Sequence, residues 1–432
     1  MNREDLRTII ADQLTALLKK PSEAEVPRQF DLLGQLKYPE VTVLMGVRRC
    51  GKSTLLRQLA RALQGQVALH YLNFEEQRLS RFTVDDFQSA YEEFLVTARS
   101  DAKQVLIYDE VQLVVGWERW VAGLSSREQV KVFVTGSNSF MLSSELASLL
   151  TGRHLPLHIT PFSFSELVAA DPEASPINSV QRATTAVNIR RRQIFEDFQK
   201  FGGFPRAVAS RDIAILGQYY EDIVQKDIAL RKGVRNVVGL KQLGSLLASQ
   251  NTRLFNQSAV AKELGIKSSL TIGKFCDYFK ETYLYSEIRQ FSRSKRQQLR
   301  GRAKFYAVDP LMAKESGFHH TDSEYWILEN HVCNELLRRR HELFYWNSRE
   351  GYEVDFIARR RDGIYEAIQV AVSLSRPETL ERELRALACA KRDLEITRRT
   401  IITRDDQDNK NLQVGDVNVV PFYRWALEGL AD

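Results

Sequence analysis

The sequence predicts an α/β protein whose first domain is built on a parallel β-sheet. From residue 41 onward, short apolar runs rich in β-branched residues alternate with stretches of helical character, the order typical of a parallel sheet covered by helices. Each run is apolar enough to be buried on both faces, as parallel strands are. The 432 residues include 44% hydrophobic and 27% charged residues, a globular composition, and leave room for roughly two to four domains. The expected strands are 41–45, 67–74, 105–108, 132–135 and 155–159.

The composition excludes several classes of protein. The longest apolar runs fall far short of the roughly 20 residues that a membrane-spanning helix needs, and the acids Glu4 and Asp5 stand where a signal peptide has its basic region. We therefore expect a cytoplasmic protein with no membrane partner. Four scattered cysteines offer neither a disulfide framework nor a zinc-ligand spacing. The net charge of +6 is compatible with a nucleic-acid partner but does not require one.

Five parts are expected along the chain. An amphipathic helix begins the sequence, and a polar stretch with two prolines follows the last expected strand. Beyond it, the helical pattern is broken at residues 202–206, Gly-Gly-Phe-Pro-Arg, where one helix should end and another begin. The parts are an amino-terminal helix and connector (1–40), an α/β core (41–170), a loop and helical lid (171–235), a winged-helix-like region (236–310) and a second α/β domain (311–432).

The strongest motif is a glycine-rich loop between the first expected strand and a helix. Residues 46–53 read Gly-Val-Arg-Arg-Cys-Gly-Lys-Ser, which matches the phosphate-binding loop of P-loop NTPases in spacing and context. Glycines let the backbone amides turn toward phosphates, Lys52 can reach the β- and γ-phosphates, and the Ser53 hydroxyl can hold Mg²⁺. Arg48 and Arg49 either contact phosphates or point into solvent. The expected nucleotide-binding residues are Gly46, Arg48, Arg49, Cys50, Gly51, Lys52, Ser53 and Thr54.

Two later strands lead into polar residues. The first leads into Asp109 and Glu110. We expect Asp109 to hold Mg²⁺ together with Ser53, while Glu110 polarises the attacking water. The second strand leads into Ser137 and Asn138, either of which can orient that water. Taken alone, the acid pair would be interpreted as a cap for the next helix, and the Ser-Asn pair as a structural turn.

Together these motifs resemble those of an AAA+ ATPase. More narrowly, four segments are similar to a prokaryotic family of ATPases that carry an AAA+ domain and a carboxyl-terminal domain of unknown function. The resemblance implies ATP as the nucleotide, and a homo-oligomer in which Arg153 is an arginine finger that reaches a neighbour's γ-phosphate. It also implies that Arg206 is the second sensor of the lid. The alternatives without a catalytic role are a local ion pair for Arg153 and a structural role for Arg206. The four segments are 46–56, 109–112, 135–138 and 150–153.

Residues 239–290 have a helix-turn-helix pattern. A helix, a turn at Gly265 and a second helix opened by Lys267 precede two strand-like runs, and a dense basic stretch covers 293–304. Such a surface is typical of duplex DNA binding, so we expect double-stranded DNA to contact residues 257–304. The same pattern also serves as a protein-interaction fold, and a charge run is often a solvated face.

The end of the chain resembles a restriction-nuclease-like fold with a degenerate site. Such enzymes bind Mg²⁺ with an Asp and, on the next strand, an acid, any residue and a Lys. Here Asp355 and the helix residue Glu329 are present, but Gln369 and Ala371 occupy the acid and lysine positions. An amide is a poor Mg²⁺ ligand. We therefore expect a restriction-endonuclease-like α/β domain without nuclease activity, in which Glu366 belongs to a partial set or Asp355 is an ordinary strand-end acid.

As a whole, the sequence predicts a Mg²⁺-dependent ATPase. Lys52, Asn138 and Arg153 would assist Glu110 in the chemistry, and the nucleotide state would move a carboxyl-terminal half that binds DNA or a protein. The alternative is a slow nucleotide switch or scaffold that binds a partner with little turnover. An ATP-dependent nuclease is disfavoured because the acid and the lysine are missing.

Overall fold

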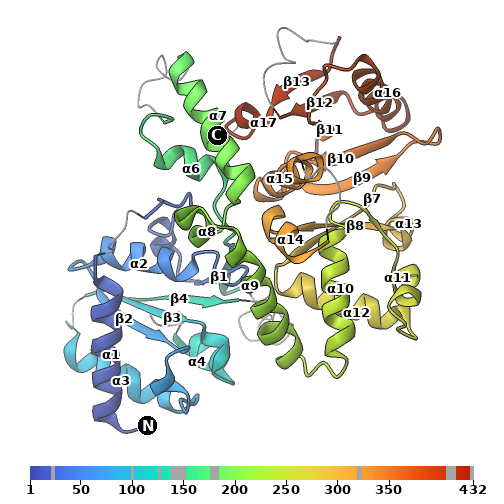
Figure 1. The fold of residues 1–432 in the computed structure, drawn as a ribbon. Coiled ribbons are helices and arrows are strands. Elements are labelled where there is room, and N and C mark those ends of the chain that lie inside the picture. Colours follow the sequence, from blue (N-terminus) through green and yellow to red (C-terminus); the bar gives the residue numbers. More distant parts are fainter. Residues whose placement is uncertain are drawn as a thin grey trace. The chain divides into compact units, whose positions relative to one another are not determined.

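The computed structural model divides the chain into two compact units (Figure 1). The first unit holds residues 1–160 with the short segment 281–283, and the second holds residues 161–280 and 284–432. The residues that the structure describes are 1–20, 25–98, 102–124, 127, 129–137, 152–175, 184–318, 324–404 and 415–428.

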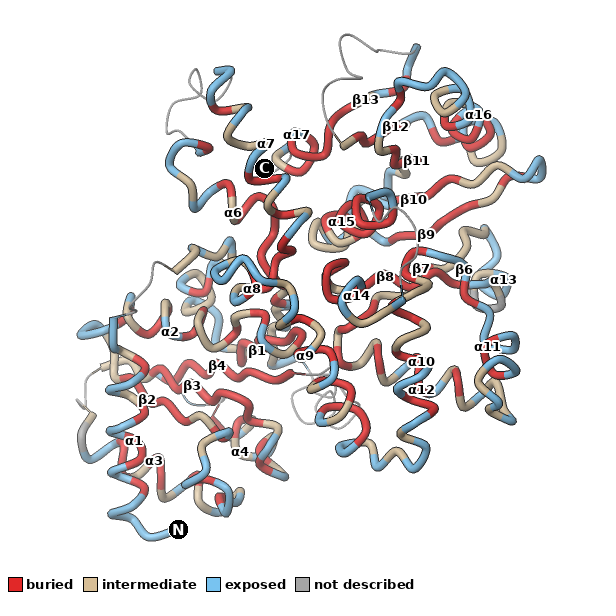
Figure 2. Tube along the Cα trace, in the orientation of Figure 1, coloured by how far each residue is buried: buried red, intermediate tan, exposed pale blue. Residues whose placement is uncertain are grey.

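The first unit is built on a five-stranded sheet in which every neighbouring pair of strands is parallel. The strand order is β2-β3-β4-β1-β5, which confirms the five predicted strands. Figure 2 shows the central strands as buried, and this explains their continuous apolar sequence. The strands are β1 (Val41–Met45), β2 (Ala68–Asn73), β3 (Gln104–Asp109), β4 (Val130–Gly136) and β5 (His154–His158).

Helices of the first unit pack their apolar faces on this sheet. The expected amino-terminal helix is α1 (Arg3–Leu18). It begins at Asn2, whose side chain accepts a hydrogen bond from the Glu4 N–H at 3.3 Å. Leu6 and Ile9 are buried in the same core as β1 and β3 residues. The other helices are α2 (Lys52–Leu63), α3 (Asp86–Thr97) and α4 (Trp117–Leu124), with the 3₁₀ turns η1 (Gly34–Lys37), η2 (Gln77–Leu79) and η3 (Val111–Leu113).

The second unit begins with helices. A capping box formed by Ser163 and Glu166 starts the first of them, and Pro205 stands in the first turn of α8, where its missing N–H costs nothing. The helices up to the end of the helix-turn-helix pattern are α6 (Phe164–Ala170), α7 (Thr185–Phe201), α8 (Pro205–Ser210), α9 (Ala214–Asp222), the π-helix η6 (Ile223–Leu230), α10 (Val237–Ser249), α11 (Gln257–Glu263) and α12 (Ser269–Glu281).

The break between α7 and α8 has a steric cause. A Cβ atom on Gly202 would lie 2.5 Å from the Asp309 carboxylate, and one on Gly203 would lie 2.3 Å from the Phe162 carbonyl oxygen. The Gly203 N–H donates to Asp309 at 2.7 Å. Only glycines allow this close approach of the backbone, so the helical pattern stops where the sequence predicts.

A second sheet of eight strands contains the rest of the fold. Its order is β13-β12-β11-β10-β9-β7-β8-β6. The antiparallel hairpin β7–β8 is joined to β9 by a parallel pairing. The strands are β6 (Leu254–Phe255), β7 (Tyr285–Gln290), β8 (Ala303–Ala307), β9 (Glu342–Asn347), β10 (Glu353–Arg359), β11 (Tyr365–Ala371), β12 (Arg398–Thr403) and β13 (Asn418–Pro421).

The sheet therefore runs across the expected boundary between 236–310 and 311–432. The two strand-like runs that follow the helix-turn-helix pattern, β7 and β8, belong to the same sheet as the strands of the last domain, since β7 lies between β8 and β9. Within the described ranges, no helix has the length and apolarity to cross a membrane. The remaining helices are α13 (Lys295–Arg300), α14 (Pro310–Ser316), α15 (Glu324–Arg338), α16 (Pro377–Leu394) and α17 (Phe422–Trp425).

Candidate functional site

The glycine-rich loop joins β1 to α2, as the motif requires. The backbone of Gly46 lies close to the Ile159 carbonyl, because a Cβ atom added to Gly46 would lie 1.9 Å from that oxygen. Gly51 adopts a left-handed conformation with φ of 105° and precedes the first residue of α2. Lys52 is only 4% exposed. Its Nζ donates to the carbonyl oxygens of Gly46 at 2.9 Å and Val47 at 3.1 Å.

Contacts around the loop fix its shape. The Cys50 thiol is buried and donates to the Ile159 carbonyl at 3.3 Å. The guanidinium of Arg28 donates to the carbonyls of Cys50 at 3.0 Å and Thr160 at 2.6 Å. Sequence reasoning did not find Arg28, because nothing in its neighbourhood marks it as a partner of the loop.

The other loop residues differ in their surroundings. Arg48 forms an ion pair with Glu75, whereas Arg49 is exposed and has a positive φ of 67°. Thr54 is half-buried in the first turn of α2. Glu75 lies just past the end of β2, so Arg48 is tied to the neighbouring loop. The part that either arginine plays toward phosphates stays a prediction.

Asp109, the last residue of β3, is fully buried and accepts several hydrogen bonds. The Tyr71 hydroxyl donates to Oδ2 at 3.1 Å, and the Thr135 hydroxyl donates to Oδ1. The Ser53 side chain lies close enough to lower the pKa of this carboxyl as well. Burial and then the neighbouring charge of Glu110 raise the pKa of Asp109, and the three hydroxyls oppose that rise. A cation held here would favour the ionised carboxylate.

Glu110 lies at the turn that follows β3. It is 9% exposed and has a positive φ of 53°, which is uncommon for a residue with a side chain. Its N–H donates to the Thr135 hydroxyl at 2.9 Å, and the Gln112 side-chain amide donates to its carboxylate. Thr135 and Gln112 were not among the expected site residues. The signal for Thr135 was present in the strands, because β4 pairs in parallel with β3 and Val134 lies opposite Tyr108.

The structure gives fewer contacts for the remaining expected site residues. Asn138 lies outside the described residues, while Ser137 is buried at the end of β4. Arg153 is exposed just before β5, and its side chain makes no ion pair with the described part of the chain. Arg206 is exposed on α8 of the second unit. The roles of these residues stay predictions.

The donor set at the strand ends fits a nucleotide with Mg²⁺. A hydroxyl and one carboxylate are the protein ligands that Mg²⁺ takes when phosphates and water complete its shell. Among the described residues, no group of three or more His, Cys, Asp or Glu side chains could hold a metal ion, so a metal held only by the protein is not indicated. Lys52 carries a buried positive charge whose contacts are neutral carbonyls.

The comparisons with known proteins agree with this geometry. A family model described as an AAA domain matches residues 38–168. Models of two domains of unknown function, DUF8612 and DUF4143, match residues 192–315 and 326–425. An uncharacterized protein of Haemophilus influenzae is 31% identical over 376 residues, which is 83% of this chain and 89% of that protein. The chain belongs to a prokaryotic family of AAA+ ATPases with a carboxyl-terminal domain of unknown function.

More distant similarities were also found. An uncharacterized protein of Methanocaldococcus jannaschii is 29% identical over 405 residues, 90% of this chain and 88% of that protein. Among solved structures, the chain is similar to the Aeropyrum pernix Orc1 protein in complex with DNA (TM-score 0.30, 14% identity, 72% of this chain and 91% of that chain). It is also similar to C. elegans PCH-2 (TM-score 0.30, 12% identity, 48% and 60%).

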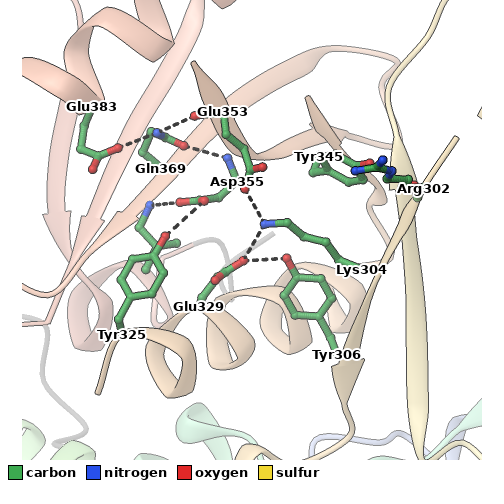
Figure 3. Close-up of polar contacts among 11 residues, drawn as sticks. Arg302, Lys304, Tyr306, Tyr325, Glu329, Tyr345, Glu353, Asp355, Gln369 and Glu383 are labelled. Atoms are coloured by element: carbon green, nitrogen blue, oxygen red, sulfur yellow. Dashed lines mark hydrogen bonds and ion pairs between the residues drawn. The ribbon is translucent and has the colours of Figure 1, made fainter. Parts of the chain in front are cut away.

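The carboxyl-terminal part of this AAA+ ATPase family member contains a second buried polar cluster, shown in Figure 3. Lys304 on β8 is 4% exposed, and its Nζ lies 2.7 Å from Glu353 and 3.4 Å from Glu329. The Tyr306 hydroxyl donates to Glu329 at 2.7 Å. Burial acts to lower the pKa of Lys304, but the charges of Glu329, Asp355 and Glu353 outweigh it and raise that pKa.

The expected nuclease-like residues lie in this cluster, where other protein groups bind them. Asp355 accepts from the Val370 N–H at 2.8 Å and from the Tyr325 hydroxyl at 3.3 Å. The Gln369 amide accepts from the Asp355 N–H at 2.7 Å and donates to Glu383 at 2.6 Å. Burial, then the charge of Glu329, raises the pKa of Asp355 well above its ordinary value.

Two expectations for this region need correction. Glu366 does not join the cluster, because the Thr400 hydroxyl donates to it at 2.6 Å on the neighbouring strand. Lys304 was expected to belong to a DNA-contacting stretch ending at residue 304, but it is buried among carboxylates. Every residue of β8 is buried, and α15, which carries Glu329, packs against this strand. Ala371 is buried in an apolar core.

Proposed function

We propose that this protein binds ATP with Mg²⁺ and hydrolyses it to ADP and phosphate. The observation that supports the proposal most directly is the proximity of the glycine-rich loop to Asp109, the last residue of β3. Ser53 follows Lys52 in the first turn of α2, and its side chain lies close enough to Asp109, at the end of β3, to lower the pKa of that carboxyl. This is the arrangement in which a hydroxyl and a carboxylate share one Mg²⁺.

Each residue has a distinct task in this reaction. The loop amides and the Lys52 ammonium bind the β- and γ-phosphates, whose charge replaces the neutral carbonyls now contacted by Lys52. Bound Mg²⁺ neutralises charge on the phosphates. Glu110 accepts a proton from the attacking water. Thr135 fixes the positions of Asp109 and Glu110 relative to each other, since its hydroxyl contacts both the Asp109 carboxylate and the Glu110 N–H.

Steady-state ATP hydrolysis by the wild type and by Glu110→Gln tests the proposal. The variant retains the size of the side chain but cannot accept the proton, so turnover should fall on the order of 10²-fold or more. A fluorescent ATP analogue should still bind. Wild-type turnover equal to that of the variant, with ATP still bound, would instead favour the slow nucleotide switch. Hydrolysis of GTP, measured in parallel, decides the nucleotide preference.

We also propose that the active form is a homo-oligomer with Arg153 acting in trans. The support is its exposure just before β5, without an ion pair to the described residues. The rate per subunit should rise with protein concentration, and Arg153→Ala should remove that rise. Equal loss of activity in a proven monomer would place Arg153 in its own subunit's site.

A second proposed activity is binding of double-stranded DNA by residues 257–304, which hold the second and third helices of the helix-turn-helix pattern and the basic stretch after them. Lys267 before α12 and Lys295 and Arg296 on α13 are exposed, without ion pairs to the described residues. The affinity for a DNA duplex should fall steeply with salt, and each alanine substitution should reduce the logarithmic slope by about 1. Lys314→Ala, at an exposed position of α14, is the matched control. A flat salt dependence would remove this activity and leave the nucleotide chemistry intact.

A further inference from the structure

Gln112 lies beside the proposed catalytic base, Glu110. The NH₂ group of its side-chain amide is hydrogen-bonded, but the carbonyl oxygen is not. Gln112 is the middle residue of η3, directly after β3. Its Nε2 donates to Glu110 Oε2. Its Oε1 is buried and accepts no hydrogen bond from the described residues.

The orientation of this amide follows from its neighbour. A carboxylate only accepts hydrogen bonds, so the NH₂ group is the end of the amide that contacts Glu110, and the carbonyl oxygen is the end left without a donor. A buried acceptor without a donor is unfavourable. The structure therefore holds a hydrogen-bond acceptor beside the proposed base, and a donor that arrives with the substrate would satisfy it.

The backbone of the turn holds this pair in place. Glu110 has a left-handed conformation, which costs free energy for a residue with a Cβ. The turn is retained because the Glu110 N–H is bound by the Thr135 hydroxyl and because Gln112 binds the side chain. Residues 110 and 112 are thus brought together at the carboxyl end of β3, next to Asp109.

We propose that Gln112 orients the water that attacks the γ-phosphate, together with Glu110. This inference rests on the proposed ATPase function. The water donates one hydrogen bond to the Glu110 carboxylate and the other to Gln112 Oε1, which leaves a lone pair for phosphorus. A bond forms between the water oxygen and the γ-phosphorus, and the bond to the β–γ bridging oxygen breaks. The electron pair stays on ADP, and the proton passes to Glu110.

The decisive variant is Gln112→Met, which keeps the length of the side chain and removes both hydrogen-bonding groups. We expect kcat to fall on the order of 10²-fold, with KM and ATP affinity changed by less than about twofold, because the lost contact exists mainly in the transition state. Gln88→Met is the matched control, since Gln88 also donates to a glutamate, Glu92, at 3.0 Å, but on an exposed helix. The control should retain wild-type kcat.

Coupling with Glu110 separates water orientation from a structural role. If both residues hold one water, the double variant Glu110→Gln, Gln112→Met should be no slower than Glu110→Gln alone. Gln112→Glu, of the same size, places two carboxylates side by side. It should therefore move the acidic limb of the pH–rate profile to higher pH.

The possible failures are distinct. A Gln112→Met enzyme with kcat within twofold of wild type, beside an inactive Glu110→Gln, overturns this inference and leaves the ATPase proposal standing. Additive losses in the double variant, or an unchanged pH profile for Gln112→Glu, also overturn it. Normal hydrolysis by Glu110→Gln removes the proposed function itself.

Discussion

Two buried lysines show how this chain uses the same charge for different purposes. Lys52 and Lys304 are each 4% exposed. The contacts of Lys52 are backbone carbonyl oxygens, whereas Lys304 lies between the carboxylates of Glu353 and Glu329. Burying a cation among neutral partners costs free energy, because the ion loses its hydration. Carboxylates bound to the cation offset that desolvation cost.

Two buried aspartates on internal strands, Asp109 at the end of β3 and Asp355 within β10, differ in the same way. Asp109 accepts hydrogen bonds from the hydroxyls of Tyr71 and Thr135, groups that can shift when a cation binds. Asp355 is bound by the Val370 backbone and by a tyrosine, within hydrogen bonds that extend through Gln369 to Glu383. The Asp109 cluster suits a bound cation, whereas the Asp355 cluster is already neutralised by its own lysine, Lys304.

The largest expected effect comes from Lys52→Met. Productive ATP binding should be lost, because the methionine cannot contact phosphates, while the unfolding free energy should change by less than about 1 kcal/mol since no carboxylate loses its partner. Titration with a fluorescent ATP analogue and urea unfolding measure the two quantities. Unchanged hydrolysis in this variant would remove the distinction between the two lysines.

Lys304→Met should give the opposite pattern. Removing the ammonium leaves buried carboxylates without compensation, so the stability of the second unit should fall by roughly 3–5 kcal/mol. ATP binding in the first unit should survive. Hydrogen exchange of peptides from α15 and β10 reports the loss, with exposed Lys314→Met as the control. A variant as stable as the control would show that the cluster contributes no specific stabilisation.

The pH dependence of stability gives the smallest expected effect. Folding raises the pKa of Asp355, so the folded state holds this proton more tightly than the unfolded state. The stability that the group contributes is present at low pH and is lost as pH rises through the raised pKa. Relative to wild type, Asp355→Asn should therefore gain stability as the pH rises above about 4, the ordinary pKa of an aspartate, toward the raised pKa of Asp355. Urea unfolding across that range tests this, and a constant difference would contradict it.

Local motifs made the first unit predictable. The glycine spacing, the strand before it and the helix after it all lie within residues 41–63, so the loop could be placed without knowledge of distant contacts. The contribution of Thr135 required the strand register, because it contacts Asp109 across 26 residues of sequence.

The second unit was harder to predict from the sequence, because its structure depends on contacts between residues that are far apart in the chain. Lys304 ends a run of exposed basic residues, and in sequence nothing distinguishes it from them. It is buried because α15 packs against β8 and brings Glu329, 25 residues away, beside it. The parallel pairing of β7 with β9 joins segments that no turn connects directly. Helix α16 and strands β12 and β13 were not predicted, although they cover and extend the carboxyl-terminal sheet.

The position of Lys304 also bears on how such a protein can be divided or recombined. The lysine lies in the region matched by DUF8612, and both of its carboxylate partners lie in the region matched by DUF4143. A genetic crossover between residues 315 and 326 would place a buried ammonium opposite side chains that did not evolve with it. Fragments cut at that point would each carry unmatched charge. The two regions should therefore be exchanged, expressed and inherited as one piece.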